Sequence, residues 1–375
     1  MYSLLIQLTT TASFHASRCF FKVYQNLFHW LKSVINSWLM LIRMTAIVHD
    51  ERFSLHDNPS HPERAERLLS VMEYIKELPF YGELEHITPE PISEESLLRV
   101  HSDEMVARIK STVGWLDPDT YLSEDSYEVA RLAAGGLTKA CDVVASGDVD
   151  NAFALIRPPG HHATATRSMG FCLFNNAALA ADYLTRQGKR VLIFDHDVHH
   201  GNGVADIFYD RSDVLYESVH LSPHFPGTGA VDEIGVGPGR GYTVNAPLPH
   251  RVGDEGVREI MREIMLPVAE QFDPDFVIVC AGFDSHHTDA LGGLFFTIDF
   301  YGELLRQLMD VQSDLVCTLE GGYKLDVLKK GVAIELGMLH GTPLTCDDEA
   351  EDGRDPGSVI DDLRRMLEPY WDVSS

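Results

Sequence analysis

Basic residues are scarce in this 375-residue chain, in which 30 Lys and Arg stand against 57 Asp and Glu for a formal net charge of −27. A field of that sign repels phosphate backbones, so direct binding of nucleic acid is not expected, whereas solubility and cationic ligands are favoured. Hydrophobic residues make up 45% of the chain and charged residues 23%, which is typical of a globular protein with a substantial core.

Cysteine is also sparse and never occurs as a CxxC pair, which excludes the common zinc-finger and dithiol redox motifs. Several of the six cysteines lie in apolar surroundings, which indicates buried, reduced thiols and a cytoplasmic protein. They are Cys19, Cys141, Cys172, Cys280, Cys317 and Cys346.

Acidic residues are missing from the first 49 positions, although they abound afterwards. Residues 20–43 carry apolar side chains at helical spacing, but Lys22, Gln25, His29 and Lys32 interrupt any run long enough to cross a bilayer. Two interpretations stay open: an interfacial amphipathic helix that gives peripheral membrane contact, or a misassigned start with translation beginning at Met44. We therefore divide the chain into an extension at 1–43 and a main domain at 44–375.

From Met44 onward, short apolar runs alternate with helical patterns and no repeats occur. Uniformly apolar runs are typical of parallel strands buried on both faces, and six are predicted, at 45–48, 152–156, 190–194, 214–219, 276–281 and 315–319. Helices are predicted at 62–77, 127–146, 176–187 and 254–271, the first with a capping box formed by Ser60 and Glu63. This pattern predicts one doubly wound α/β domain.

Polar motifs follow five of the six predicted strands. Because ligands bind beyond the carboxyl ends of parallel strands, we expect these motifs to meet in a single site. They are RPPGHHA (157–163), DHDVHHGNG (195–203), HLSPHFPGTG (220–229), GFDSHH (282–287) and EGGY (320–323).

The DHDVHHGNG motif has the spacing of a metal site. Asp195, Asp197 and His199 project to one side of an extended chain, while His196 and His200 project to the other side and are expected to be structural. Asp197 and His199, joined by Asp284 from another strand end, would bind a catalytic cation and leave room for water and substrate. A buried network of ion pairs is the alternative.

Other residues at the same edge suit acid–base chemistry. His161 and His162 could transfer protons beside a metal, with Asp195 orienting one ring and Asn202 the other. The Tyr323 phenol could donate a hydrogen bond to an oxyanion. Taken singly, paired loop histidines and a turn tyrosine are often merely structural, so the interpretation depends on their convergence.

Six motifs in this order, RPPGHHA, GFCLFNN, FDHDVHHGNG, HFPGTG, AGFDSH and LEGGY, resemble the histone deacetylase superfamily. HHGNG and HPER look like its class II and bacterial or archaeal branches, which include acetylpolyamine amidohydrolases. The resemblance covers about residues 44–370. It implies the arginase/deacetylase fold, an eight-stranded parallel sheet with helices on both faces, and zinc-dependent hydrolysis of an acetylated amine.

The resemblance also implies roles for individual residues. The metal ligands would be Asp197, His199 and Asp284, the general base His162, its neighbour His161 the partner of Asp195, and Tyr323 the transition-state donor. Substrate contacts would come from Gly170, Phe171, Phe225, the rim residue Leu291 and, from the DPDTY loop, Asp119. A structural K⁺ ion would be held by Asp195, Asp197, His199, Ser218 and Val219.

One departure from the class I pattern concerns Asn202, which stands where class I members have an aspartate. A neutral partner stabilises imidazolium less, so the pKa of His162 should be lower than with a carboxylate.

Several alternatives stay open at this stage. The apolar rim residue Leu291 favours acetyl-lysine in a peptide or protein over an acetylpolyamine, although the net charge of −27 attracts cations generally. A silent acyl-lysine-binding pseudo-enzyme and an arginase-like two-metal hydrolase are the rivals from other classes. The metal could be Zn²⁺, Fe²⁺ or Co²⁺, and the oligomeric state is not predicted.

Overall fold

The computed structural model describes residues 43–350 and 353–374. The extension predicted at 1–43, with its two interpretations, lies outside the described residues apart from Arg43. Residues Arg43–Ser375 form one compact unit. In the part of the chain that is described, no helix is long and apolar enough to cross a membrane.

The centre of the fold is an eight-stranded sheet in which every neighbouring pair of strands is parallel. The strand order is β2-β1-β5-β10-β9-β6-β7-β8. The strands are β1 (Thr45–Val48), β2 (Glu85–Ile87), β5 (Asn151–Ala154), β6 (Val191–Asp195), β7 (Val214–Leu221), β8 (Thr243–Leu248), β9 (Phe276–Ala281) and β10 (Leu315–Leu319). The prediction of a doubly wound parallel sheet is confirmed.

The two edge strands escaped prediction for physical reasons. β2 is largely exposed, so it needs no apolar run. β8 contains Asn245 and Pro247, which are typical of turns, yet a proline is tolerated where one side of the strand has no partner. The six interior strands are fully buried, and their mainly apolar sequences made them predictable.

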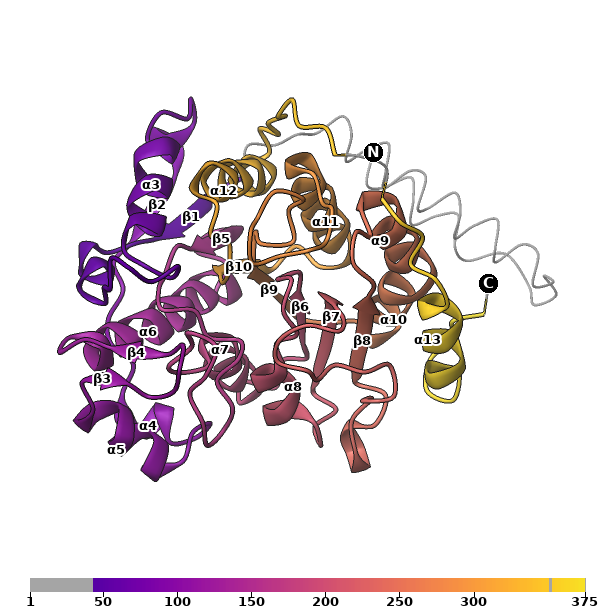
Figure 1. Cartoon of the computed structure of the whole chain (residues 1–375), viewed down its shortest axis with the longest axis horizontal. Helices are drawn as coiled ribbons and strands as arrows, with labels where there is room; N and C mark the ends of the chain where they lie inside the picture. The colour runs from indigo at the N-terminus through magenta and orange to yellow at the C-terminus, as the bar shows by residue number, and fades with distance from the viewer. Residues whose placement is uncertain (1–42, 351–352, 375) are drawn as a thin grey trace, which may run out of the picture. The chain divides into compact units, whose positions relative to one another are not determined.

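Helices cover both faces of the sheet (Figure 1). On one face α6 packs against α7, and on the other α12 packs against both α3 and α11. The helices are α3 (Glu66–Ile75), α4 (Glu94–Leu97), α5 (Asp103–Ser111), α6 (Ser126–Ala145), α7 (Asn176–Thr185), α8 (Asn202–Phe208), α9 (Asp254–Ile260), α10 (Leu266–Phe272), α11 (Ile298–Val311), α12 (Leu325–His340) and α13 (Val359–Leu367). A π-helical turn, η5 (Met261–Met265), joins α9 to α10, so the predicted helix 254–271 is continuous but irregular. A small hairpin of β3 (Gly114–Trp115) and β4 (Tyr121–Leu122) carries the DPDTY loop.

The predicted capping box is wrong. Helix α3 begins at Glu66 after Ala65, which makes no side-chain capping bond. Glu63 is instead fully buried and accepts two hydrogen bonds from Arg157, at 2.8 and 2.7 Å, and one from Arg67 at 3.2 Å. A carboxylate that looked like a helix signal therefore pairs with two buried guanidinium groups.

Arg67 links the buried Glu63 carboxylate to the carboxyl end of β10. Its guanidinium donates to the carbonyl oxygens of Glu320 at 2.6 Å and Gly322 at 2.8 Å, and it lies 5.0 Å from the centre of the Tyr323 ring. The loop that carries Tyr323 is thus fixed to α3 through a buried charge.

Replacing Glu63 should be severely destabilising. Glu63→Gln leaves Arg67 and Arg157 buried without their anion, and breaking a buried ion pair from one side costs about 3–5 kcal/mol. We expect urea denaturation to show a loss of that size in the free energy of unfolding. Glu66→Gln is the matched control, because its side chain is 57% exposed beside Arg64 and should cost less than about 1 kcal/mol. Equal losses in the two variants would contradict a central role for Glu63.

Candidate functional site

The five strands followed by polar motifs are neighbours in the sheet, in the order β5-β10-β9-β6-β7. Their register brings the ends together, since Asp195 at the end of β6 pairs with Ser218 on one side and Cys280 on the other. The motifs therefore leave the sheet at one edge, as expected for parallel strands.

Three predicted metal ligands converge at this edge. Asp197, His199 and Asp284 each offer a ligand atom, and these atoms all lie within 4.8 Å of one another. The Nδ1 atom of His199 is 2.9 Å from Asp197 Oδ1 and 3.4 Å from Asp284 Oδ2. Both carboxylates are fully buried.

The pKa shifts of His199 and Asp284 show that this site favours added positive charge. Burial alone disfavours the His199 imidazolium, but the hydrogen bond with Asp197 and the negative charge of the nearby Asp284 outweigh it and raise its pKa to about 10. Burial and the adjacent Asp197 charge raise the pKa of Asp284 to about 6. Two buried carboxylates at such close range need a cation between them.

The space around the three groups suits a metal ion. Asp284 Oδ2 is buried without a hydrogen-bond partner among the described residues. A Cβ atom on Gly321 would lie 2.2 Å from that oxygen and 2.4 Å from Asp197 Oδ2, so only glycine leaves the space before both carboxylates open. Two carboxylates and one imidazole suit Zn²⁺, and also Fe²⁺ or Co²⁺.

Two other groups of potential ligands fit a metal less well. His286 Nδ1 accepts from the Thr288 amide at 3.1 Å, so its Nε2 carries a proton and donates to Asp348 at 2.8 Å. That pair forms a hydrogen bond, with His287 beside it. In the group of His161, Cys172 and Glu320, burial raises the pKa of the Cys172 thiol well above its usual value, which keeps it protonated.

The two histidines of RPPGHHA have the partners predicted for them. His161 Nδ1 lies 3.0 Å from Asp195 Oδ2, and His162 Nδ1 lies 2.9 Å from Asn202 Oδ1. Because each partner oxygen accepts, each Nδ1 carries a proton, and a neutral His162 leaves its Nε2 free as a base.

The surroundings of the two rings separate their pKa values. Burial opposes the His161 imidazolium, but the Asp195 and Asp197 carboxylates raise its pKa to about 10. Burial lowers the pKa of His162 well below its usual value, and the positive charges of His161 and His199 lower it further. One ring is therefore a cation and its neighbour a neutral base at pH 7.

The aromatic residues predicted at the site flank it from two sides. Phe171 packs edge-on against the half-buried Tyr323, with ring centroids 5.7 Å apart. Phe225, 38% exposed, packs edge-on against His162 at 5.1 Å and His199 at 6.1 Å. Burial raises the pKa of Tyr323 well above its usual value, so the phenol keeps its proton.

Gly170 allows the side chains of His162 and Phe225 to lie close to its backbone. Its φ is +57°, and a Cβ atom there would lie 2.5 Å from His162 Cδ2 and 3.0 Å from Phe225 Cε1. A larger residue would push the base and the aromatic ring apart.

The remaining predicted substrate residues lie on loops beside this site. Leu291 is half-buried. Asp119 is half-buried in the β3–β4 hairpin, where the next residue, Thr120, accepts a hydrogen bond from the Phe171 amide at 3.2 Å. Burial raises the pKa of Asp119, with Asp117 adding to the shift and a hydrogen bond from the Gly170 backbone opposing it.

The K⁺ site stays a prediction. Asp195 is buried at the end of β6 and pairs with Ser218, which is buried within β7 beside Val219. Asp197 and His199 follow Asp195 by two and four residues. The Ser218 hydroxyl bonds with His220 Nδ1 at 2.9 Å.

His196 and His200 face away from the metal ligands, as expected. His196 Nδ1 donates to the Gly282 carbonyl at 3.0 Å, and its Nε2 lies 3.1 Å from Glu335. His200 Nδ1 bonds with Thr228 at 2.8 Å. Both rings therefore have polar partners other than the metal ligands.

Two residues that support the site escaped the sequence analysis. The Tyr216 hydroxyl donates to Asp195 Oδ2 at 3.1 Å from the neighbouring strand. The buried Glu320 carboxylate accepts from the backbone amides of Gly160 at 2.7 Å and His161 at 3.2 Å, and burial raises its pKa to about 7. A polar residue inside an apolar strand was the available signal for Tyr216, and the acidic residue before two glycines was the signal for Glu320.

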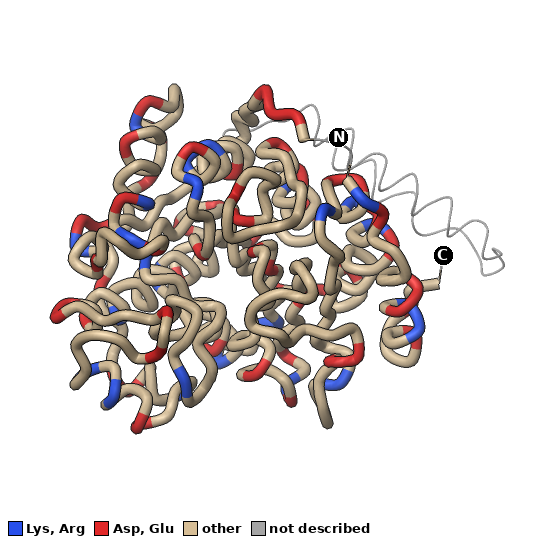
Figure 2. The backbone as a smooth tube through the Cα atoms, in the orientation of Figure 1, with Lys and Arg blue, Asp and Glu red and all other residues tan. Residues whose placement is uncertain are grey.

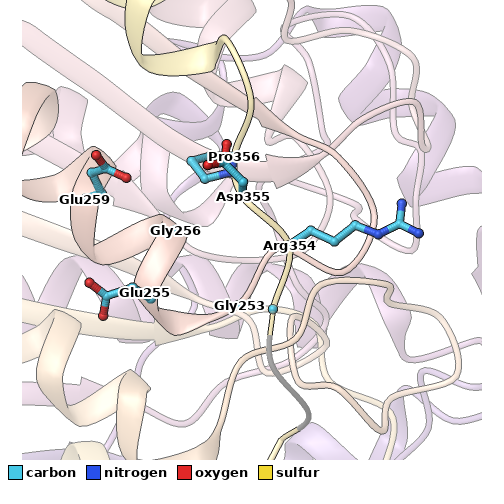
Figure 3. Close-up of a pocket in the computed structure, with 8 residues that line it drawn as sticks. Gly253, Glu255, Gly256, Glu259, Arg354, Asp355 and Pro356 are labelled. Carbon is cyan, nitrogen blue, oxygen red and sulfur yellow. The ribbon is translucent and has the colours of Figure 1, made fainter.

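A surface cavity of about 170 Å³ lies elsewhere, and Figure 3 shows its lining. None of the predicted site residues lines it, and its lining contains no imidazole, thiol or hydroxyl group. The lining residues are Gly253, Glu255, Gly256, Glu259, Gly353, Arg354, Asp355 and Pro356. Figure 2 shows acidic positions on many of the described loops and helices around the sheet.

Comparison with known proteins gives consistent matches. The family model described as the histone deacetylase domain matches residues 61–339. A probable deacetylase of Archaeoglobus fulgidus is 40% identical over 354 residues, covering 88% of this chain and 99% of that protein. Histone deacetylase 15 of Arabidopsis thaliana is 39% identical over 313 residues, covering 79% of this chain and 57% of that protein. The crystal structure of the HDA15 HD domain superposes with a TM-score of 0.83 at 36% identity, covering 88% of this chain and 97% of that one.

Asn202 should set the pKa of His162, which NMR titration of the imidazole can measure. Asn202→Asp places a negative charge beside Nδ1, and an opposite charge at that range raises an imidazole pKa by about 1–3 units. His220 is an internal control, because its pKa of about 4 comes from burial and should not move. An unchanged His162 pKa in the variant would show that Asn202 does not control its charge.

Proposed function

This chain belongs to the histone deacetylase family, and from that premise we propose that it hydrolyses an acetylated amine, with acetyl-lysine in a peptide or protein as the favoured substrate. The observation that carries the proposal is the convergence of Asp197, His199 and Asp284 beside a neutral His162. Acetate and the free amine would be the products.

A divalent metal, proposed to be Zn²⁺ with Fe²⁺ or Co²⁺ as alternatives, would be held by Asp197, His199 and Asp284. When bound, it supplies Lewis-acid polarisation of the acetyl carbonyl and lowers the pKa of water. A structural K⁺ ion would be held by groups of Asp195, Asp197, His199, Ser218 and Val219.

The protein's own groups move the protons. Asn202 Oδ1 keeps a proton on His162 Nδ1, so the free Nε2 takes a proton from water as that water attacks the acetyl carbon. The Tyr323 phenol donates a hydrogen bond to the carbonyl oxygen as negative charge develops there. When the C–N bond breaks, the His162 imidazolium gives its proton to the leaving amine.

His161 has a different role from its neighbour. With its pKa raised to about 10 by Asp195 and Asp197, it stays protonated through the cycle. Its fixed positive charge holds the pKa of His162 down and stabilises negative charge forming nearby.

The lining supports a linear acylated side chain as the substrate. Phe171 and Phe225 would contact its methylene groups, Gly170 leaves room beside His162 and Phe225, and Asp119 would hold the substrate backbone. The apolar rim residue Leu291 offers no anion to a secondary ammonium, which favours acetyl-lysine over an acetylpolyamine. An acetylpolyamine or other small acyl amide remains the second candidate, because the net charge of −27 attracts polycations.

Tyr323→Phe should lower kcat by about 10²–10³-fold, because removing one oxyanion donor typically costs that much. Turnover of a fluorogenic acetyl-lysine peptide by the metal-loaded protein measures the effect. Tyr370→Phe, a change at an exposed tyrosine in the C-terminal region, is the control and should retain full activity. Wild-type turnover by Tyr323→Phe would remove the tyrosine from the mechanism, and an inactive wild type would favour a pseudo-enzyme.

A direct comparison of substrates tests the choice between them. We expect kcat/KM for an acetyl-lysine peptide to exceed that for acetylspermidine by at least about tenfold, because an unpaired ammonium at an apolar rim loses about 1.4 kcal/mol or more. Leu291→Glu should narrow or reverse the preference. A strong preference of the wild type for the polyamine would overturn the argument from Leu291.

A further inference from the structure

The backbone of the rim residue Leu291 is held on both sides by side chains that the mechanism does not use. His224 Nε2 donates to the Leu291 carbonyl oxygen at 3.0 Å. The Leu291 amide donates to Asp289 Oδ1, also at 3.0 Å. Both peptide groups of the rim residue therefore have a fixed partner.

His224 also touches a proposed metal ligand. Its ring stacks on His199, with centroids 4.9 Å apart and an interplanar angle of 18°. A single half-buried imidazole thus spans the distance from the metal site to the rim.

Asp289 connects Leu291 in the same way to Tyr323, the proposed oxyanion donor. Its second oxygen, Oδ2, accepts from the Tyr323 amide at 2.7 Å and from the Lys324 amide at 2.9 Å. Only 8% of Asp289 is exposed, so water does not readily replace these bonds.

We propose that His224 and Asp289 are positioning residues that hold Leu291 at a fixed position relative to His199 and Tyr323. This inference rests on the proposed function. A substrate that packs against the rim is then placed at the correct depth for both groups that act on its amide. Neither residue is catalytic, since neither is placed against the reacting atoms.

His224→Phe tests the first connection because it keeps an aromatic ring against His199 and removes the donor to Leu291. Losing one such hydrogen bond is worth about 1 kcal/mol, so KM for an acetyl-lysine peptide should rise about 3–10-fold with kcat within twofold. His86→Phe, at an exposed histidine on β2, is the control and should change neither constant.

Asp289→Asn tests the second connection. An amide has one oxygen, so its NH₂ group must face either the Leu291 amide or the amides of Tyr323 and Lys324. Displacing Tyr323 should lower kcat by about 10–100-fold. Asp299→Asn is the control, because Asp299 on α11 also accepts a hydrogen bond from a backbone amide, that of Cys346, and bonds to neither Leu291 nor Tyr323 in the described hydrogen bonds.

Leu291→Ala separates positioning from simple support of the fold. In that background His224→Phe should add less than twofold to KM, since the rim contact it serves is already lost. Binding of a fluorescent acetyl-lysine peptide, measured by anisotropy in the Tyr323→Phe background, should weaken 3–10-fold with His224→Phe. This binding assay also tests the inference if the wild type turns over no acetylated amine, a result that would count against the proposed function alone.

Two results would overturn the inference. The first is unchanged kcat, KM and peptide affinity in both His224→Phe and Asp289→Asn. The second is a fall in kcat that matches the unfolded fraction seen by circular dichroism, with KM and affinity unchanged, which would show a purely structural role.

Discussion

Charge buried at the carboxyl edge of the sheet is the constraint on which the rest of this structure depends. Asp195, Asp197 and Asp284 are fully buried, and taking carboxylates out of water is costly unless each finds compensating donors or cations. Asp197 accepts hydrogen bonds from the backbone amides of His199 and Gly321. Asp195 accepts hydrogen bonds from the His161 ring and the Tyr216 hydroxyl. Asp284 Oδ2 has no such donor among the described residues, which supports a metal ion as the missing positive charge.

The same constraint gives two adjacent histidines opposite properties. His161 faces a buried carboxylate and is held as a cation, whereas His162 faces a neutral amide and lies among positive charges. Adjacent residues with separated pKa values are a common basis for dividing acid and base roles. The division comes from the surroundings of each ring, since the Asp195 and Asp197 carboxylates raise the pKa of His161, whereas burial and the positive charges of His161 and His199 lower the pKa of His162.

The sequence predicted the parts of the fold that follow local rules. Interior strands such as β9 and β10 are apolar because both faces are buried, while β2 and β8 lie at the edges and carry no such pattern. The convergence of Asp197, His199 and Asp284 could be predicted from spacing and from the family motifs. Glu63 was misinterpreted because its partner Arg157 is remote in sequence, and the bond between His224 and Leu291 was invisible for the same reason. Contacts between side chains and distant peptide groups depend on tertiary geometry, which no local pattern encodes.

The position of β10 in the sheet determines when the fold can be completed. β10 pairs with β5 on one side and β9 on the other, so it alone joins the strands β2-β1-β5 to the strands β9-β6-β7-β8. It is also the last of the eight strands to leave the ribosome. Until then, two partial sheets present the open edges of β5 and β9, which are templates for pairing with other chains. Nascent chains should therefore depend most on chaperones until β10 has left the ribosome, and the loop that bears Tyr323 closes the site only after the two halves have joined.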